Sequence, residues 1–300
     1  MRMVVDILIL GAGWSSQFLR PICDERGITY AATTRSGRDS TIKFDFDPDS
    51  NNPEPYYALP QARVVLITFP IVVKGASERL VRLYAQTHPS EGDANHSDAA
   101  TKFIQFGTTG IWDAARLNLE KPQTIQDLWY DRHSGITSTP RAEAENELLA
   151  LNGDFPTTVL NLAGLWGGAR SPKNWVGRVA GTKEGLKNKG SLHVIHGIDV
   201  ARAVLAVCGD FGKAKGQRWL LTDNRVYDWW DLASAWGTPP VQSSLADTDK
   251  GPQAAWVREL MDEYGVRALP RDVQQLGRAL DSREFWTTFG ITPVKPLLQD

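Results

Sequence analysis

The amino-terminal stretch from residue 4 to residue 16 constrains the fold more than any other part of the chain. Residues 4–10 (VVDILIL) are mostly β-branched or aliphatic and contain no turn former, which is typical of a strand buried in a parallel sheet. The run stops at Gly11-Ala12-Gly13, and the residues up to about Arg26 have a helix-compatible pattern. A strand, a glycine turn and a helix in this order predict a site for a pyrophosphate.

Each residue of the turn has a physical role in this interpretation. Gly11 allows the tight turn, and Gly13 lets the backbone approach a pyrophosphate that a Cβ would obstruct. The free amides of the new helix, from Trp14, Ser15 and Ser16, would face the anion. Ser16 stands where the fingerprint usually has a third glycine, and its small side chain is still compatible with helix–strand packing. A plain β-turn-α unit with no ligand is the alternative.

The second strand decides which dinucleotide the chain is expected to bind. Residues 28–35 (ITYAATTR) form a strand pattern close enough to complete a βαβ unit. In NAD-binding units an acidic residue ends this strand and binds the ribose 2′-hydroxyl. Here the strand runs into Thr34, Arg35, Ser36 and Arg38, which offer hydroxyls and guanidinium groups to a 2′-phosphate. The sequence therefore predicts NADP(H), with a solvated loop as the alternative.

Further strand patterns follow in alternation with helix patterns. Strands are expected at residues 41–46, 63–69, 102–106, 157–162 and 218–222, and helices at 77–87, 141–151 and 254–264. Phe69 and Pro70 end the 63–69 strand and would lie beside the cofactor. The alternation predicts an α/β fold, a Rossmann doubly wound parallel sheet with a smaller C-terminal substrate lobe. We assign residues 1–165 and 191–225 to the NADP(H)-binding domain, and 166–190 and 226–300 to the small lobe.

Composition limits the class of partner. The 300 residues are 42% hydrophobic with a net charge of −2, and no dense basic stretch is present, so we expect no nucleic-acid partner. Cys23 and Cys208 lie far apart in apolar patterns and are interpreted as reduced core residues. No apolar run approaches the ~20 residues of a membrane span. We expect a cytoplasmic protein with a small-molecule substrate, no membrane partner and no metal, and we leave a homodimer open.

The chain resembles the extended and atypical short-chain dehydrogenase/reductases, the NAD(P)-dependent epimerase/dehydratase group, and most closely its YeeZ-like members. Four segments carry the resemblance and spread over nearly the whole chain: Gly11-Ala12-Gly13-Trp14, Leu162-Ala163-Gly164-Leu165-Trp166-Gly167, residues 193–201 (HVIHGIDVA), and Asp281-Ser282-Arg283 followed by residues 289–293 (FGITP). The resemblance implies a Rossmann fold and adds Ala163 and Gly164 to the cofactor site.

The resemblance also implies where the catalytic residues should stand. Enzymes of this family use a Ser or Thr after the fifth strand, here Thr108, and a Tyr-x-x-x-Lys motif, which falls on Thr137 and Arg141. Thr replaces Tyr and Arg replaces Lys, so the usual proton relay is missing: a Thr hydroxyl cannot be brought near neutrality, and Arg141 does not release a proton. Thr108 and Arg141 would also contact the cofactor. Thr109, Trp112, Trp166 and Arg170 are candidates for binding substrate.

The missing acid needs a replacement if the protein is a reductase. Tyr130, with Asp131 and His133 beside it, lies in a long segment that could reach the nicotinamide, although these residues could equally anchor the loop. We expect Glu143 and Glu145 to be solvated helix charges. The leading hypothesis is an NADP(H)-dependent oxidoreductase acting on a small or medium organic carbonyl or alcohol. An epimerase, isomerase or dehydratase with bound cofactor and a catalytically silent NADP(H)-binding regulator are the alternatives.

Overall fold

A seven-stranded parallel sheet forms the centre of the structure, a computed structural model that describes residues 4–89, 100–113, 128–238 and 251–297. Its strands are, in chain order, β1 (Val4–Leu10), β2 (Tyr30–Thr34), β3 (Ile42–Lys43), β4 (Gln61–Ile67), β5 (Lys102–Thr108), β7 (Thr157–Leu162) and β11 (Arg218–Leu221). Across the sheet their order is β11-β7-β5-β4-β1-β2-β3, and each neighbouring pair is parallel. The predicted doubly wound parallel sheet is confirmed.

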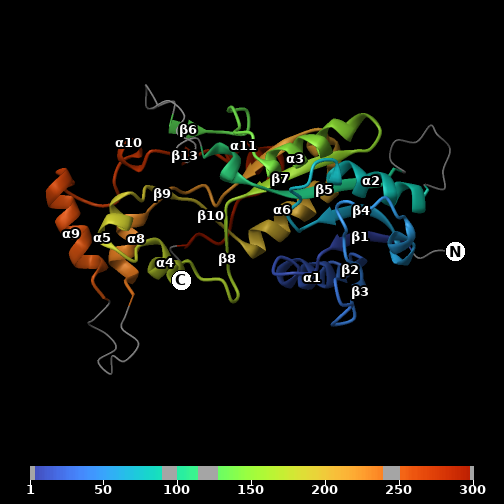
Figure 1. Ribbon diagram of the computed structural model, residues 1–300, viewed down its shortest axis with the longest axis horizontal. Helices are drawn as coiled ribbons and strands as arrows, with labels where there is room; N and C mark the ends of the chain where they lie inside the picture. Colours follow the sequence, from blue (N-terminus) through green and yellow to red (C-terminus); the bar gives the residue numbers. More distant parts are fainter. Residues whose placement is uncertain (1–3, 90–99, 114–127, 239–250, 298–300) are drawn as a thin grey trace.

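Helices cover both faces of the sheet (Figure 1). They are α1 (Ser16–Glu25), α6 (Gly197–Gly209) and α7 (Phe211–Ala214) on one face, and α2 (Ala76–Thr87) and α3 (Pro140–Ala150) on the other. Because successive side chains of a strand point to opposite faces, Ile7 and Ile9 pack in the core beneath α1 and α6, while Leu8 and Leu10 pack beneath α2 and α3. This double burial explains why β1 is almost continuously apolar.

The strand order reverses between β1 and β4. Chain connections run outward in both directions from this point, towards β2 and β3 on one side and towards β5, β7 and β11 on the other. The loops at the carboxyl ends of β1 and β4 therefore diverge, which is where open α/β sheets bind their ligands.

A smaller lobe lies beside the sheet (Figure 1, left). It contains β8 (Gly164–Trp166), β9 (Ser191–Leu192), β10 (Val194–His196), β12 (Tyr227–Asp228), η7 (Pro172–Trp175), α4 (Val176–Val179), α5 (Lys183–Lys187), α8 (Trp229–Trp236) and α9 (Gln253–Tyr264). Trp166, Trp229, Trp230, Val257 and Leu260 are buried in its core. Tryptophan is thus used here mainly as bulk for a small hydrophobic core.

The remaining elements connect these parts. They are β6 (Trp129–Tyr130), β13 (Ala279–Leu280), α10 (Val273–Leu276), α11 (Arg283–Thr288), η1 (Glu54–Ala58), η3 (Thr109–Trp112) and η6 (Leu151–Gly153). Phe285 and Trp286 of α11 pack in the core beneath α1 and α6, although we assigned residues 226–300 to the small lobe. The domain boundaries stay a prediction: α11 packs on the sheet, whereas Leu297 is buried in the core of the small lobe.

One buried ion pair holds the small lobe together. Asp228 and Arg271 have side chains that are 0% and 5% exposed, and both carboxylate oxygens accept hydrogen bonds from the guanidinium group, the shortest at 2.7 Å. Asp228 also accepts the Trp230 amide at the start of α8, and the Arg271 guanidinium stacks on the Trp230 ring at 3.8 Å. Removing one charge would leave the other buried without a counter-charge.

We expect Asp228→Asn to lower the free energy of unfolding by about 3–5 kcal/mol, because Arg271 would then be a buried, uncompensated cation. Urea denaturation followed by circular dichroism measures this change. Asp210→Asn is the matched control: its partner Lys213 is half-exposed, so the loss should stay below about 1 kcal/mol. Equal losses for the two variants would contradict the role assigned to the buried pair.

Candidate functional site

A cavity of about 810 Å³ opens at the carboxyl ends of β1, β2 and β4, where the strand order reverses. Among the residues predicted for the site, those that line it are Gly11, Gly13, Trp14, Ser15, Thr34, Arg35, Ser36, Arg38, Phe69, Pro70 and Arg170. The residues that line it without having been predicted as site residues include Phe44, Asp45, Phe46, Pro48, Ile71, Val72, Val73, Phe106 and Leu165. This volume is within the usual range of ligand-binding cavities.

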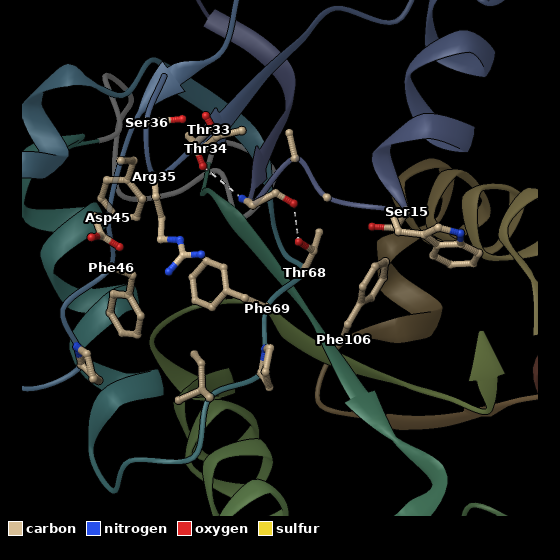
Figure 2. A pocket seen from close by; sticks show the side chains of 18 of the residues that line it. Ser15, Thr33, Thr34, Arg35, Ser36, Asp45, Phe46, Thr68, Phe69 and Phe106 are labelled. Atoms are coloured by element: carbon tan, nitrogen blue, oxygen red, sulfur yellow. Dashed lines mark hydrogen bonds between the residues drawn. The ribbon is translucent and has the colours of Figure 1, made fainter. Parts of the chain in front are cut away.

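The glycine turn is fixed to both neighbouring strands. Gly11 has φ +91°, and a Cβ there would lie 2.8 Å from Oγ1 of Thr68. The Gly11 amide donates to Oγ1 of Thr33 at 3.0 Å, and Oγ1 of Thr68 donates to the Gly11 carbonyl at 2.6 Å (Figure 2). Position 11 therefore requires glycine for the protein's own packing, because both the backbone conformation and the contact with β4 exclude a side chain.

Gly13 differs from Gly11 in what surrounds it. Its φ is outside the left-handed region, and a Cβ would meet only the Gly11 carbonyl oxygen, at 3.9 Å. Gly13 lines the cavity, so the space beside it is available to a ligand. The amides of Trp14 and Ser15 have no acceptor among the described residues, and α1 begins directly after them. Unpaired amides at a helix start, next to an open backbone, fit a pyrophosphate.

The turn after β2 presents the predicted basic residues. Oγ1 of Thr34 accepts the amides of Gly37 and Arg38 at 3.0 and 3.2 Å, so this hydroxyl shapes the turn. Arg35 and Ser36 lie beside one another at one side of the cavity (Figure 2). Arg38 is largely exposed and makes a long ion pair of 3.7 Å with Asp39. Among the described residues, the cavity wall contains three arginines and a single carboxylate, Asp45, which favours an anionic ligand.

An aromatic wall at the same side joins the predicted Phe69 to Phe46, which was not predicted. The rings of Phe46 and Phe69 are stacked, with centroids 5.4 Å apart and an interplanar angle of 27°, and Asp45 lies next to Phe46 (Figure 2). Flat apolar rings and one carboxylate acceptor fit an aromatic base that carries an amino group. The sequence contains a signal for this wall in the alternating pattern of residues 41–46, where Phe44 and Phe46 stand on either side of Asp45.

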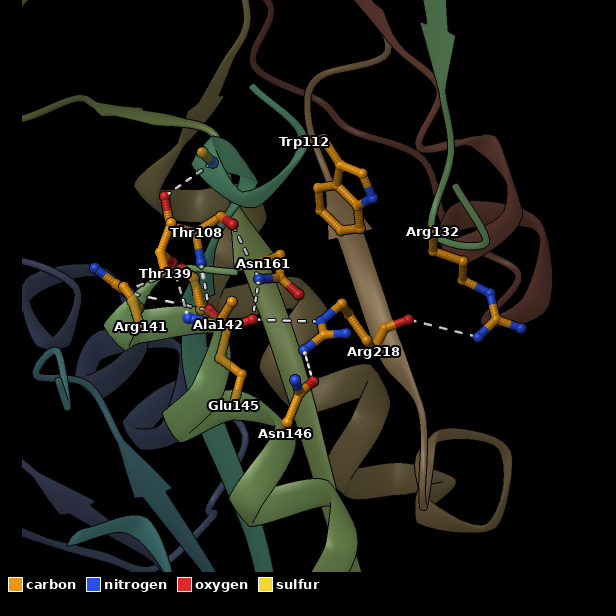
Figure 3. Close-up of polar contacts among 12 residues, drawn as sticks. Thr108, Trp112, Arg132, Thr139, Arg141, Ala142, Glu145, Asn146, Asn161 and Arg218 are labelled. Carbon is orange, nitrogen blue, oxygen red and sulfur yellow. Dashed lines mark hydrogen bonds and ion pairs between the residues drawn. The ribbon is translucent and has the colours of Figure 1, made fainter. Parts of the chain in front are cut away.

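The residues at the degenerate relay form a buried polar network (Figure 3). Oε1 of Glu145 accepts the Thr108 amide at 3.1 Å, and Nδ2 of Asn161 donates both to the Thr108 carbonyl at 3.0 Å and to Oε2 of Glu145 at 2.7 Å. Nε of Arg218 donates to Oε2 of Glu145 at 3.3 Å. Glu145 and Asn161 therefore fix the backbone of Thr108 at the end of β5, on both its donor and its acceptor side.

Glu145 corrects an expectation. We expected a solvated helix charge, but its side chain is 0% exposed. Burial raises the pKa of this carboxyl, while the hydrogen bond from Asn161 and the charge of Arg218 act in the opposite direction. Glu145 can approach the strand because residue 107 is glycine: a Cβ there would lie 2.6 Å from Oε1 of Glu145 and 2.4 Å from Nδ2 of Asn161.

The predicted relay residues do not line the cavity. Arg141 donates from Nη2 to the carbonyls of Phe106 and Gly107, at 3.1 and 3.2 Å, so it braces the end of β5. Thr137 lies before α3, whose N-terminal cap is Thr139. The amide of Thr137 donates to the Ile111 carbonyl. Thr108 is half-buried at the end of β5, and its Oγ1 accepts the Gly110 amide at 3.1 Å.

Tyr130 is another predicted residue that the structure places away from the cavity. It belongs to β6, which pairs with β13, and its carbonyl accepts the Asp281 amide at 2.8 Å. Its ring packs against the cluster that contains Trp112, Leu220 and Leu280. The segment is held by strand pairing and by this hydrophobic contact, so the expectation that Tyr130 reaches over the cofactor is not met in this structure.

The predicted substrate residues other than Arg170 are buried. Trp112 is 0% exposed and donates from Nε1 to the Ser134 carbonyl, Trp166 is 2% exposed beside His196, and Thr109 is 7% exposed. In this structure they do not line the cavity, because large rings gain more by filling the core, and their contact with substrate stays a prediction.

Three predicted cofactor residues also lie outside the cavity wall. Ser16 is buried and donates from Oγ to the Gly13 carbonyl at 2.7 Å, so it closes the first turn of α1. Ala163 is buried and Gly164 half-buried at the junction of β7 and β8.

The described residues also bear on metal binding and on membrane insertion. Within those ranges, no cluster of three or more His, Cys, Asp or Glu side chains is placed to hold a metal ion. The helices in the same ranges include none with the length and apolar character needed to cross a membrane.

Comparisons with known proteins agree with this geometry at the level of the fold. No family model and no curated protein matches the chain. Among solved structures, a short-chain dehydrogenase/reductase superfamily protein from Agrobacterium tumefaciens with bound NAD is 11% identical, with a TM-score of 0.60 over 99% of this chain and 94% of that one.

Two more solved structures extend the likeness. Yeast methylglyoxal/isovaleraldehyde reductase Gre2 complexed with NADPH is 13% identical, with a TM-score of 0.56 over 99% of this chain and 95% of that one. UDP-N-acetylglucosamine 4-epimerase from Bacillus cereus is 10% identical, with a TM-score of 0.56 over 98% of this chain and 93% of that one. The chain therefore shares its Rossmann-like α/β fold with these solved structures.

The contrast between the two glycines gives a test of the site. Gly13→Val should fold normally, because its side chain meets no protein atom closely, yet weaken dinucleotide binding by at least about tenfold by filling the cradle. Isothermal titration calorimetry measures the affinity, and thermal denaturation verifies folding. The control is Gly153→Val, at a position outside the cavity where a Cβ would meet no atom within 4 Å; this variant should leave binding unchanged. Unaltered affinity in the Gly13 variant would place the ligand elsewhere.

Proposed function

We propose that this chain, which has the fold of the extended short-chain dehydrogenase/reductases, belongs to that family and is an NADP(H)-dependent oxidoreductase. Its substrate would be a small or medium organic carbonyl or alcohol. The observation that carries the proposal is the cavity at the strand-order reversal, where an open glycine cradle and unpaired amides lie next to a basic turn. The glycine cradle and the unpaired amides match the pyrophosphate of a dinucleotide, and the basic turn matches the 2′-phosphate of the same molecule.

The preference for NADP(H) rests on the turn after β2. Arg35, Ser36 and Arg38 line the cavity where an NAD-binding unit would have a carboxylate for the ribose hydroxyls. Guanidinium groups can bind a phosphate through two parallel hydrogen bonds, and the Ser36 hydroxyl adds a further donor. Asp45 lines the same side and is suited to the amino group of the base.

The protein's share of the chemistry is binding, orientation and exclusion of water. When bound, the nicotinamide supplies or accepts the hydride. Phe69, Phe106 and Leu165 give the cavity apolar walls, which keep water away from the reacting carbon. Thr108 does not line the cavity itself, but it lies two residues after Phe106 of the cavity wall, and its backbone is fixed on both sides by Glu145 and Asn161. Its hydroxyl would donate a hydrogen bond to a substrate carbonyl that reaches the end of β5.

The proton is the unusual part of this mechanism. Thr137 and Arg141 cannot act as a general acid near neutral pH, and Tyr130 is packed away from the cavity. We therefore assign proton delivery to a solvent water that reaches the substrate oxygen at the open side of the cavity, whereas the apolar walls shield the carbon that exchanges the hydride. This route should give a slower turnover than a positioned acid, since general acid catalysis contributes about 10²–10⁴-fold.

A catalytically silent NADP(H)-binding regulator is the second candidate. The observation that favours it is Arg141, whose guanidinium braces the β5 carbonyls of Phe106 and Gly107 instead of lining the cavity. In this alternative the cofactor would bind and no carbonyl would be reduced.

The cofactor preference gives one prediction. Arg35→Ala should reduce the preference for NADPH over NADH by about 1–3 kcal/mol, because a charge-assisted contact to the 2′-phosphate is lost. Calorimetric titration of both dinucleotides into both proteins measures this difference. Arg63→Ala removes an exposed arginine outside the cavity and should leave the preference unchanged. Tighter binding of NADH than of NADPH by the unaltered protein would refute the assignment.

Turnover gives a second prediction. With a panel of aldehydes and ketones, NADPH oxidation followed by absorbance should reveal a reducible substrate, and Thr108→Ala should lower kcat about 10–1000-fold through loss of one transition-state donor. Tyr130→Phe should leave kcat unchanged, since the ring keeps its packing and the hydroxyl is away from the cavity. A protein that binds NADPH but reduces no carbonyl in the panel would favour the regulator.

A further inference from the structure

A short hairpin of the small lobe folds onto the glycine turn. Residues 167–170 form this hairpin, in which Gly167 and Arg170 exchange backbone hydrogen bonds of 2.8 and 3.1 Å. Nε1 of Trp14 donates to the Gly167 carbonyl at 2.9 Å. The hydrogen bond joins two segments that are 153 residues apart, so the hairpin is anchored to the residue that follows Gly13.

Two glycines permit this close approach. Gly167 has φ +108°, and a Cβ there would lie 2.3 Å from Nε2 of His196. Gly168 has φ +58° and would place a Cβ 3.5 Å from the Phe18 ring of α1. The backbone of the hairpin is therefore shaped to bring residue 170 over the start of α1.

The side chain of Arg170 is held at the cavity. Its guanidinium carbon lies 4.7 Å from the centre of the Trp14 ring, and the residue lines the cavity while remaining exposed. No carboxylate of the described residues forms an ion pair with it. Asp45, the one carboxylate among the described lining residues, lies with Arg35 on the side opposite to Ser15, the neighbour of Trp14 (Figure 2). Within the described part of the chain, Arg170 is thus a cation that is held over the Trp14 ring and has no counter-charge.

We propose that Arg170 binds an anionic oxygen group of the ligand, a phosphate or a carboxylate, at the glycine-turn end of the cavity. This inference rests on the proposed function and adds to it a ligand contact from the small lobe. Stacking on Trp14 fixes the plane of the guanidinium group, which leaves its edge free for two parallel hydrogen bonds to such a group. The anion has two sources of the same chemistry: the pyrophosphate of the dinucleotide, or a carboxylate or phosphate of the substrate.

Arg170→Gln tests the proposal, because it keeps polarity and removes the charge. Calorimetric titrations with NADPH, NADH and 2′-AMP would be compared between the unaltered protein, this variant and Arg170→Lys. The NADPH-loaded proteins would then be titrated with inorganic phosphate and a panel of small 2-oxo acids. Arg178→Gln is the matched control, since Arg178 is an exposed arginine of the same lobe that does not line the cavity.

The outcomes separate the two sources. If the anion is the pyrophosphate, Arg170→Gln weakens NADPH and NADH alike by about tenfold or more and leaves 2′-AMP, which lacks a pyrophosphate, unchanged. If the anion belongs to the substrate, the dinucleotides are unaffected and the loaded variant loses affinity for phosphate or the 2-oxo acids. In both cases Arg170→Lys should keep part of the affinity. Dinucleotide and anion affinities that are all equal to those of the Arg178 control would overturn the proposal.

Failure of the proposed function has a different signature. If the unaltered protein binds neither dinucleotide, the proposed function fails, and inorganic pyrophosphate titrated into the free protein decides the role of Arg170. Weaker pyrophosphate binding by Arg170→Gln than by the Arg178 control would still support an anion contact. Equal binding, or no binding by any of the proteins, would refute it.

Discussion

The site depends on the backbone conformation of a single residue, Gly11. Its left-handed φ turns the chain at the end of β1, and two threonines hold this turn: Thr33 of β2 accepts the Gly11 amide, and Thr68 after β4 donates to the Gly11 carbonyl. The three central strand ends are thereby tied together at the point where the strand order reverses. The space where a Cβ of Gly13 would lie stays open to a ligand, because the bonds to the neighbouring strands are made two residues earlier, at Gly11.

A second polar assembly supports the neighbouring strand ends. Glu145 is buried and hydrogen-bonded to Arg218 and Asn161. Glu145 and Asn161 lie so close to Gly107 that a Cβ at this position would clash with both. A buried carboxylate costs free energy unless it is paired and hydrogen-bonded, and here the Thr108 amide of β5, Asn161 of β7 and Arg218 of β11 satisfy it. The network organises this end of β5: it fixes the Thr108 backbone, and Arg141 braces the carbonyls of Phe106 and Gly107 beside it.

The sequence predicted the sheet well because strand burial and glycine turns are local signals. Residues 4–10 are apolar apart from Asp6, residues 157–162 are mostly β-branched or aliphatic, and the basic turn after β2 could be identified from the five consecutive positions 34–38. Tertiary burial could not be predicted in the same way. Trp112 and Glu145 lie in segments whose local patterns are compatible with exposure, and only packing against β7 and β11 determines that both are buried. The Phe46–Phe69 stack likewise joins two segments that no local pattern connects.

A crystal structure of the protein grown with NADPH tests the central claim most directly. The account predicts that the pyrophosphate lies against the amides of Trp14 and Ser15 beside Gly13, and that the 2′-phosphate lies within hydrogen-bonding distance of the Arg35 guanidinium group. NADPH bound outside this cavity, or bound within it with the 2′-phosphate directed away from the turn after β2, would contradict the account.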